Sequence, residues 1–288
     1  RGIGVGDKVL VPALTHVATS HVVELLGAKP IFVDACPKTG NLDLNIVEEL
    51  IHKHNPKAVL PVHFLGLPCD LVELESYCEP RGIHIVEDCA LAVSSKIGNK
   101  LIGSGKNACS FSFYPVKHMT SIEGGMVTTN CKETAGLLKK AKAFGYSVQM
   151  NERKQPGMYD VDSLGFNYRM NEIEAAVGLS QIEKLREWHA IRKNNYYRYM
   201  NRLKGIDQLY YFKPVDKDRE SSYYCFNIMF QSCNVRMRNH VQEYLMANGI
   251  GTSIHYPSAV PMFKYYSSKY GYTEDMFPVA TSIANATL

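Results

Sequence analysis

The stretch SFSFYPVKHMTSIEGG, residues 110–125, decides how the rest of the chain is interpreted. Its first four residues alternate small polar with large apolar side chains, which is typical of a half-buried strand. Pro115 ends that strand, because proline cannot donate to a ladder and fixes its own φ. Lys117 is therefore expected in a turn just beyond a strand end, where α/β proteins bind ligands. Such a lysine can be a Schiff-base nucleophile if its surroundings lower its pKa, and otherwise it is an ordinary surface lysine.

Strand and helix patterns alternate upstream of this stretch. Strands are expected at 8–11, 29–33, 58–63, 84–86 and 108–113, and helices at 15–26, 44–52 and 71–78. Alternation at this spacing predicts a mostly parallel sheet that helices cover on both faces, an α/β/α fold in three layers. The three glycines before residue 8 precede a strand rather than a helix, which excludes a dinucleotide-binding loop.

Asp88 follows a buried apolar run, so its carboxylate is expected at the carboxyl edge of the sheet, where sites are built. Taken alone, a structural role for Asp88 as the cap of a following helix is slightly favoured over a role in a site. Gly124 and Gly125 permit positive φ or close backbone approach. A strand expected at 126–129 would then return along the strand before Lys117 in a hairpin-like connection.

The second half of the chain predicts a long helix and a smaller α+β unit. Asn171 can cap a helix that runs to about Lys204 and that links two domains. Its expected buried stripe consists of Ile173, Ala176, Val177, Ile182, Leu185 and Trp188. Beyond it, a strand is expected at 223–230, a helix at 235–248, and a turn with a strand at 249–256.

Composition narrows the class of protein. The chain has 288 residues, 45% of them hydrophobic and 21% charged, which is typical of a soluble globular protein. Its net charge of +4 is spread along the chain without a basic tail, which argues against a nucleic-acid partner. The eight cysteines show neither C-x-x-C nor zinc spacing, so we expect reduced cysteines, no metal and a cytoplasmic location. No apolar run is long enough to span a membrane.

Six segments in order resemble a known family: GDKVLVPALTHVATSHVVELLGAKPIFVD, PVHFLGLPCDL, IVEDCA, SFSFYPVKH…EGGMV, GFNYRMNEIEAAVGLSQI and GIGTSIHYP. Together they are similar to the DegT-type sugar aminotransferases, pyridoxal-phosphate enzymes of the aspartate aminotransferase fold (fold type I). The resemblance covers nearly the whole chain. It implies a cofactor-binding large domain at 1–200 and a small C-terminal domain at 201–288.

The resemblance also implies roles for individual residues. Lys117 would hold pyridoxal phosphate as a Schiff base and then shuttle a proton, and Asp88 would pair with the pyridinium nitrogen. Ser112 would contact the phosphate, and Asn167 would reach the phosphate of a neighbouring subunit in a homodimer with shared active sites. His16 would stack on the cofactor ring. Without the resemblance, Ser112, Asn167 and His16 are more simply a turn serine, a helix-flanking asparagine and a loop histidine.

The activity that the resemblance implies is transfer of an amino group from glutamate to a nucleotide-linked keto-deoxyhexose, for polysaccharide, lipopolysaccharide or glycan precursors. His118, His255 and Tyr256 are candidates for contacts with the sugar substrate, and a structural strand-end pair explains the last two equally well. A truncated relative that acts as a non-catalytic regulator or sensor is the alternative. A cysteine desulfurase or aspartate aminotransferase is disfavoured, because no C-terminal arginine resembles the carboxylate clamp of those enzymes.

The sequence departs from the family pattern in two respects. Leu91 stands where relatives commonly have a glutamine that contacts the phenolic oxygen of the cofactor. We also expect the N-terminal arm, whose glycine–serine/threonine turn cups the phosphate, and the usual C-terminal helix to lie outside the given chain, with weak cofactor retention if the gene product begins at Arg1. Some relatives have histidine in place of the lysine and are dehydratases, which Lys117 argues against here.

Overall fold

A six-stranded sheet forms the centre of the computed structural model, which describes residues 2–148, 152–213, 217–231 and 234–288. The strand order is β2-β1-β3-β4-β7-β8. The strands are β1 (Lys8–Pro12), β2 (Lys29–Val33), β3 (Ala58–Val59), β4 (His84–Asp88), β7 (Ala108–Ser112) and β8 (Gly125–Thr128). All neighbours are parallel except β7 and β8, which pair Ser112 with Gly125 in antiparallel register. The mostly parallel sheet and the hairpin-like return after Lys117 are confirmed.

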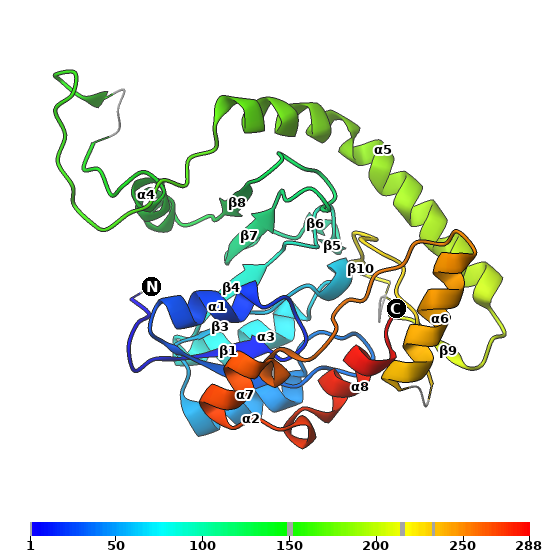
Figure 1. Cartoon of the computed structure of the whole chain (residues 1–288). Coiled ribbons are helices and arrows are strands. Elements are labelled where there is room, and N and C mark those ends of the chain that lie inside the picture. The colour runs from blue at the N-terminus through cyan, green and yellow to red at the C-terminus, as the bar shows by residue number, and fades with distance from the viewer. Residues whose placement is uncertain (1, 149–151, 214–216, 232–233) are drawn as a thin grey trace.

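Helices cover both faces of the sheet (Figure 1). Val9 and Val11 of β1 point to the face that carries α1, α7 and α8, whereas Leu10 points to the face that carries α2 and α3. This alternation is the period of two that separates the faces of a strand, and the predicted three-layer fold is confirmed. The helices of these two layers are α1 (Ala18–Leu25), α2 (Leu44–His54), α3 (Leu71–Cys78), α7 (Lys264–Tyr270) and α8 (Pro278–Ala286), with the short 3₁₀ helices η1 (Phe64–Gly66), η2 (Glu79–Arg81), η4 (Val260–Met262) and η5 (Glu274–Met276).

The long helix α5 (Glu172–Leu203) is confirmed, and it starts where the sequence predicts. Asn171 accepts from the Glu174 N–H, and the Glu174 carboxylate accepts from the Asn171 N–H, which is a capping box. The predicted buried stripe is wrong for this chain: Ile173 is 70% exposed and Ile182 is 53% exposed. The helix arches along the periphery (Figure 1), and only Gly178 and Tyr196 of it are buried. The short helix α4 (Lys132–Ala141) lies separately, beyond β8.

The C-terminal part is less regular than expected. Of the strand predicted at 223–230, only β11 (Met229–Phe230) forms, and Tyr223 at its predicted start has a φ of 54°, outside the range of extended backbone. No strand forms at 249–256, whereas α6 (Val235–Ala247) confirms the predicted helix. The remaining short strands are β5 (Lys96–Ile97), β6 (Lys100–Leu101) and β10 (Arg219–Glu220), which form one sheet, and β9 (Leu209–Tyr210), which pairs with β11.

The chain returns to the main sheet after residue 258. The Val260 N–H donates to the Ala13 carbonyl at 2.7 Å, just beyond β1. The buried Asp34 carboxylate follows β2 and accepts from the Val279 and Ala280 N–H groups at 3.0 and 2.7 Å, at the start of α8. A carboxylate at a helix N-terminus satisfies otherwise unpaired donors and favours the helix dipole. The division of the chain at residue 200 stays a prediction.

Among the described residues, no helix is both long enough and apolar enough to cross a membrane. No disulfide joins the cysteines whose placement the structure describes.

Candidate active site

Three of the predicted site residues converge at the carboxyl edge of the sheet. Asp88 is the last residue of β4, Lys117 lies in the turn after the neighbouring β7, and His16 lies between β1 and α1. The charges of Lys117 and Asp88 both act on the His16 imidazole, so the three side chains share one region. The convergence follows from the parallel order of β1, β3, β4 and β7, whose carboxyl ends meet at one edge.

Lys117 is half-buried and lies against an aromatic ring. Its Nζ atom is 5.6 Å from the centre of the Tyr224 ring, a cation–π distance. Burial lowers the pKa of Lys117, because removal from water disfavours the ammonium form, while the Asp88 carboxylate acts in the opposite direction. A lysine with a lowered pKa has more of the neutral amine that a Schiff-base nucleophile needs.

The Asp88 carboxylate is held by two donors. The Thr19 hydroxyl donates to Oδ2 at 2.8 Å, and the Ala90 N–H donates to Oδ1 at 3.0 Å. The second bond closes a turn, and β5 rather than a helix is the next element after β4, so the alternative of a helix-capping aspartate is wrong. The first bond comes from α1, 69 residues away in the chain. Each carboxylate oxygen accepts two hydrogen bonds, so both keep a free lone pair for a ligand.

Aromatic side chains form one wall of this region. The Tyr256 ring lies 6.2 Å from the His16 ring and 5.4 Å from the His255 ring, and the Tyr224 ring lies 5.9 Å from that of His255. Burial lowers the pKa of His255, and the Lys117 charge adds to the effect. Burial also raises the pKa of the Tyr256 hydroxyl, with the Asp88 carboxylate as the next contribution. These uncharged rings present flat, partly apolar surfaces beside Lys117.

His118 points away from solvent, although it follows Lys117 directly. Its side chain is only 2% exposed, and its ring centre is 5.3 Å from that of Tyr224. Burial, and then the nearby Arg192 charge, lower the pKa of His118 to about 3. The imidazole is therefore neutral at ordinary pH and packs behind the lysine, and its predicted contact with a sugar substrate stays untested.

Ser112 and Asn167 lie outside the cluster of contacts described above. The Ser112 hydroxyl accepts from the Tyr114 N–H at 3.4 Å, at the start of the turn that leads to Lys117. Asn167 is exposed, and its side-chain oxygen accepts from the Arg169 Nε–H at 3.0 Å. Asn167 pairs with Ala143 just after α4, in the segment between α4 and α5 that extends beyond the β8 edge of the sheet (Figure 1). The phosphate contacts predicted for both residues stay predictions.

Leu91 is part of the hydrophobic core. Its side chain is 4% exposed, and its carbonyl accepts from the Ser222 hydroxyl at 2.6 Å. Position 91 therefore offers no side-chain donor to a cofactor, and it instead joins the β4 turn to the segment that carries Tyr224.

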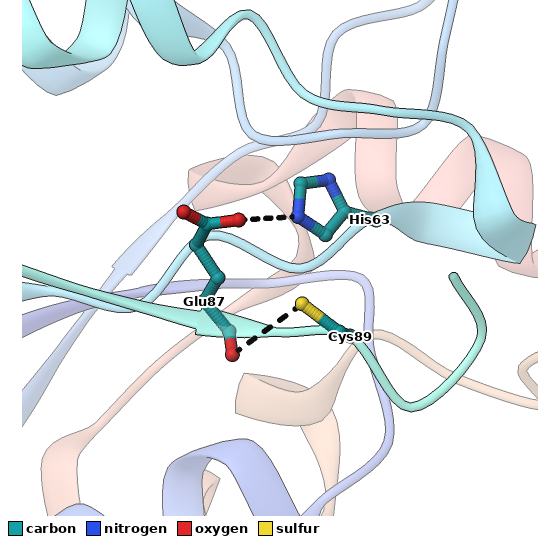
Figure 2. A group of neighbouring side chains, drawn as sticks. All are labelled: His63, Glu87 and Cys89. Atoms are coloured by element: carbon teal, nitrogen blue, oxygen red, sulfur yellow. Dashed lines mark hydrogen bonds and ion pairs between the residues drawn. The ribbon is translucent and has the colours of Figure 1, made fainter. Parts of the chain in front are cut away.

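A buried polar group at the end of β4 consists of His63, Glu87 and Cys89 (Figure 2). His63 Nδ1 accepts from the Cys69 N–H, so the Nε2–H donates to the Glu87 carboxylate at 3.1 Å. Asn107 donates to the other Glu87 oxygen at 2.8 Å. Burial would raise the pKa of Glu87, but the hydrogen bonds from His63 and Asn107 outweigh it and lower that pKa.

The possible ligand atoms of His63, Glu87 and Cys89 all lie within 4.8 Å of one another, which is close enough to hold one metal ion. The ring nitrogens and the carboxylate are, however, already occupied by hydrogen bonds within the protein. A metal ion at this position would have to displace the Nε2 proton of His63, and the buried hydrogen bond from His63 to Glu87 would be lost. We interpret His63, Glu87 and Cys89 as structural support for the end of β4.

Sequence reasoning missed three neighbours of the predicted residues. Thr19 bonds Asp88, Tyr224 lies against Lys117, and Arg192 of α5 donates to the His118 carbonyl at 3.5 Å. All three contacts join segments far apart in the chain. No local pattern marks such contacts.

The donor set fits the cofactor that the resemblance implies. A half-buried lysine of lowered pKa can bind an aldehyde, and a carboxylate with two free lone pairs can accept from a pyridinium N–H. The adjacent rings offer a flat surface for stacking. The residues present are therefore chemically suited to pyridoxal phosphate.

Known proteins resemble this chain over its whole length. GDP-perosamine synthase of Escherichia coli O157:H7 is 32% identical over 278 residues, which are 96% of this chain and 72% of that protein. The erythromycin biosynthesis sensory transduction protein EryC1 of Saccharopolyspora erythraea is 32% identical over 288 residues, covering 100% of this chain and 74% of that protein.

A solved structure, the PLP form of the putative sugar aminotransferase Spr1654 from Streptococcus pneumoniae, superposes with a TM-score of 0.90 at 25% identity. The match covers 99% of this chain and 75% of that chain. The family model of the DegT/DnrJ/EryC1/StrS aminotransferases matches residues 1–288. This chain belongs to the DegT/DnrJ/EryC1/StrS aminotransferase family.

Proposed function

We propose that this protein transfers an amino group from glutamate to the keto carbon of a nucleotide-linked keto-deoxyhexose, in the biosynthesis of glycan precursors. One observation carries the proposal: a half-buried lysine with a lowered pKa lies at the sheet edge that also presents the Asp88 carboxylate. Family membership supplies the reaction class, aminotransfer, and the perosamine synthase supports a sugar as acceptor.

Pyridoxal phosphate is the cofactor. When bound, it supplies an aldehyde carbon and a ring that delocalises electrons released from a broken C–H bond. The Lys117 amine would bind that aldehyde carbon and, once freed, carry a proton between the donor carbon and the cofactor. Asp88 would hold the ring nitrogen, Ser112 would contact the phosphate, and His16 would lie on the ring.

The sugar side of the site is proposed to consist of His255 and Tyr256, whose rings line the region beside Lys117. Because burial favours the neutral forms of both side chains, they would act as hydrogen-bonding and stacking groups rather than as charges. His118 is buried behind Lys117, so it would act on a substrate only through its neighbours.

We further propose a homodimer, in which Asn167 of each subunit reaches the phosphate site of the other. Support comes from the apolar side chains that α5 leaves exposed, such as Ile173 at 70% and Leu179 at 67%, which a second copy would cover. We place the reaction in the cytoplasm, as expected from the cysteine pattern.

The test of the enzyme reading is covalent capture of the cofactor. Protein incubated with pyridoxal phosphate should show an absorbance band that borohydride removes, leaving label on Lys117 in a peptide digest. Lys117→Ala should show no reducible adduct, whereas the exposed-lysine control Lys142→Ala should match the wild type. Amino transfer is then measured with glutamate and a panel of nucleotide-linked keto-sugars.

A regulatory protein is the second candidate, because the relative EryC1 is named a sensory transduction protein. A wild-type protein without any reducible adduct would exclude our proposal and favour this candidate. Turnover of amino-acid pairs in the absence of any sugar would instead contradict the proposed acceptor.

A further inference from the structure

Among the residues that the structure describes, Thr19 is the side chain that donates a hydrogen bond to the Asp88 carboxylate. It lies in the first turn of α1, is 5% exposed, and donates from Oγ1 to Oδ2 at 2.8 Å. The Thr15 hydroxyl, 3.2 Å away, is the other hydrogen-bonding group beside it. This contact joins α1 to the end of β4 across the sheet edge.

We propose that Thr19 is a positioning residue that holds the Asp88 carboxylate in the orientation needed to accept from the ring nitrogen of the cofactor. The proposal rests on the proposed function. The Ala90 N–H fixes Oδ1 and the Thr19 hydroxyl fixes Oδ2, so the plane of the carboxylate is set by two bonds from different elements. Loss of the Thr19 bond leaves only Oδ1 anchored, and the plane can then rotate.

The backbone cannot provide this restraint by itself. The Asp88 N–H donates to the Pro61 carbonyl at 2.8 Å, and the Asp88 carbonyl accepts from the His63 N–H at 3.2 Å. These ladder bonds place the Cα atom of Asp88. The ladder leaves the side-chain torsions of Asp88 a choice of rotamers, and the bonds from Thr19 and Ala90 together fix the orientation of the carboxylate.

The experiment compares two ligands with Thr19→Val, which replaces the hydroxyl by a methyl group of similar size. The first ligand is pyridoxal phosphate, and the second is its deaza analogue, which has C–H in place of the ring nitrogen. Affinities are measured by ultrafiltration of the folded apoprotein, checked by circular dichroism. Because the Asp88 carboxylate stays in place but is no longer held in one orientation, we expect Thr19→Val to weaken pyridoxal phosphate by roughly tenfold while it changes the analogue less than about twofold.

Thr19→Ser keeps the hydroxyl and should restore the wild-type preference for the ring nitrogen. Equal weakening of both ligands would assign Thr19 a merely structural role and overturn the proposal, as would unchanged affinity for both. Equal behaviour of Thr19→Ser and Thr19→Val would also overturn it. If Thr19→Val does not fold, Thr19→Ala carries the same two-ligand comparison. The proposed function fails separately, when wild-type protein forms no borohydride-reducible adduct at Lys117.

Discussion

The buried imidazole of His118 should make the stability of this protein depend on pH. Burial, together with the Arg192 charge, lowers its folded-state pKa to about 3, against an ordinary value of 6.5. The unfolded state therefore binds a proton on His118 at pH values where the folded state does not. Stability from this group is fully present above pH 6.5 and is lost as pH falls from 6.5 toward 3.

The magnitude follows from the two pKa values. At pH 5 the unfolded imidazole is almost fully protonated and the folded one is almost fully neutral, so the free energy of unfolding falls by about 2 kcal/mol. At pH 3 and below the loss approaches about 5 kcal/mol. Carboxylates such as Glu87, whose pKa is lowered in the fold, lose their contribution as the pH falls into and below the ordinary range of a carboxyl group, mostly under about pH 5.

The assay is urea unfolding at pH 7.5 and pH 5.0, at fixed protein concentration, of the wild type and of His118→Phe. The variant keeps an aromatic ring against Tyr224 but cannot titrate. The wild type should lose about 2 kcal/mol more than the variant between the two pH values. His52→Phe, at an exposed histidine, controls for loss of an imidazole as such. If the wild type and His118→Phe lose the same stability on acidification, the reasoning about His118 is refuted.

Two further predictions concern the frame of the site. Gly66 has a φ of 84°, and an added Cβ would lie 1.7 Å from the Ser222 hydroxyl oxygen, so Gly66→Ala should lower the unfolding free energy by about 3 kcal/mol in urea titrations. Gly82→Ala, at a φ of 64° with no atom within 4 Å, should cost only about 1 kcal/mol, and equal losses would contradict the packing argument. Asp34→Ala leaves the first N–H groups of α8 without an acceptor, so it should lower the unfolding free energy by about 3 kcal/mol in the same urea titrations. The more exposed cap variant Asp43→Ala should cost about 1 kcal/mol, and a smaller loss for Asp34→Ala than for this control would count against the role of Asp34.

Much of the fold could be predicted because its signals are local. The alternation at 110–113, the proline after it and the glycine pair at 124–125 predicted β7, the turn and β8 without any long-range information. Asn171 is likewise a local signal, an N-cap residue before an apolar run, and it predicted the start of α5. Asp88 was predicted at the sheet edge because parallel strands bring their carboxyl ends together.

The remaining features depend on contacts that no local pattern encodes. The apolar stripe of α5 has the period of a buried helix, but a period does not say whether the same chain or another molecule covers it. Tyr223 lies in an alternating run, yet its positive φ follows from how the segment 219–224 is held against β5 and the Gly66 turn. Thr19 lies 69 residues from Asp88, so only the folded chain shows that the two are bonded.

The surroundings of Lys117 suit a group that must both give and take a proton. Burial favours its neutral amine, while the Asp88 carboxylate and the Tyr224 ring favour its ammonium form. A cation–π contact contributes about 0.5–1 kcal/mol at a partly exposed site, less than one unit of pKa. The ring therefore moderates the effect of burial without reversing it, and the pKa of Lys117 stays below its ordinary value. A fully solvated lysine would hold its proton too firmly to act as a base, and a deeply buried one could not carry the proton at all. The half-buried position between a carboxylate and an aromatic ring avoids both limits, which is why we propose Lys117 as the proton carrier rather than the adjacent His118, whose pKa of about 3 keeps it neutral at ordinary pH.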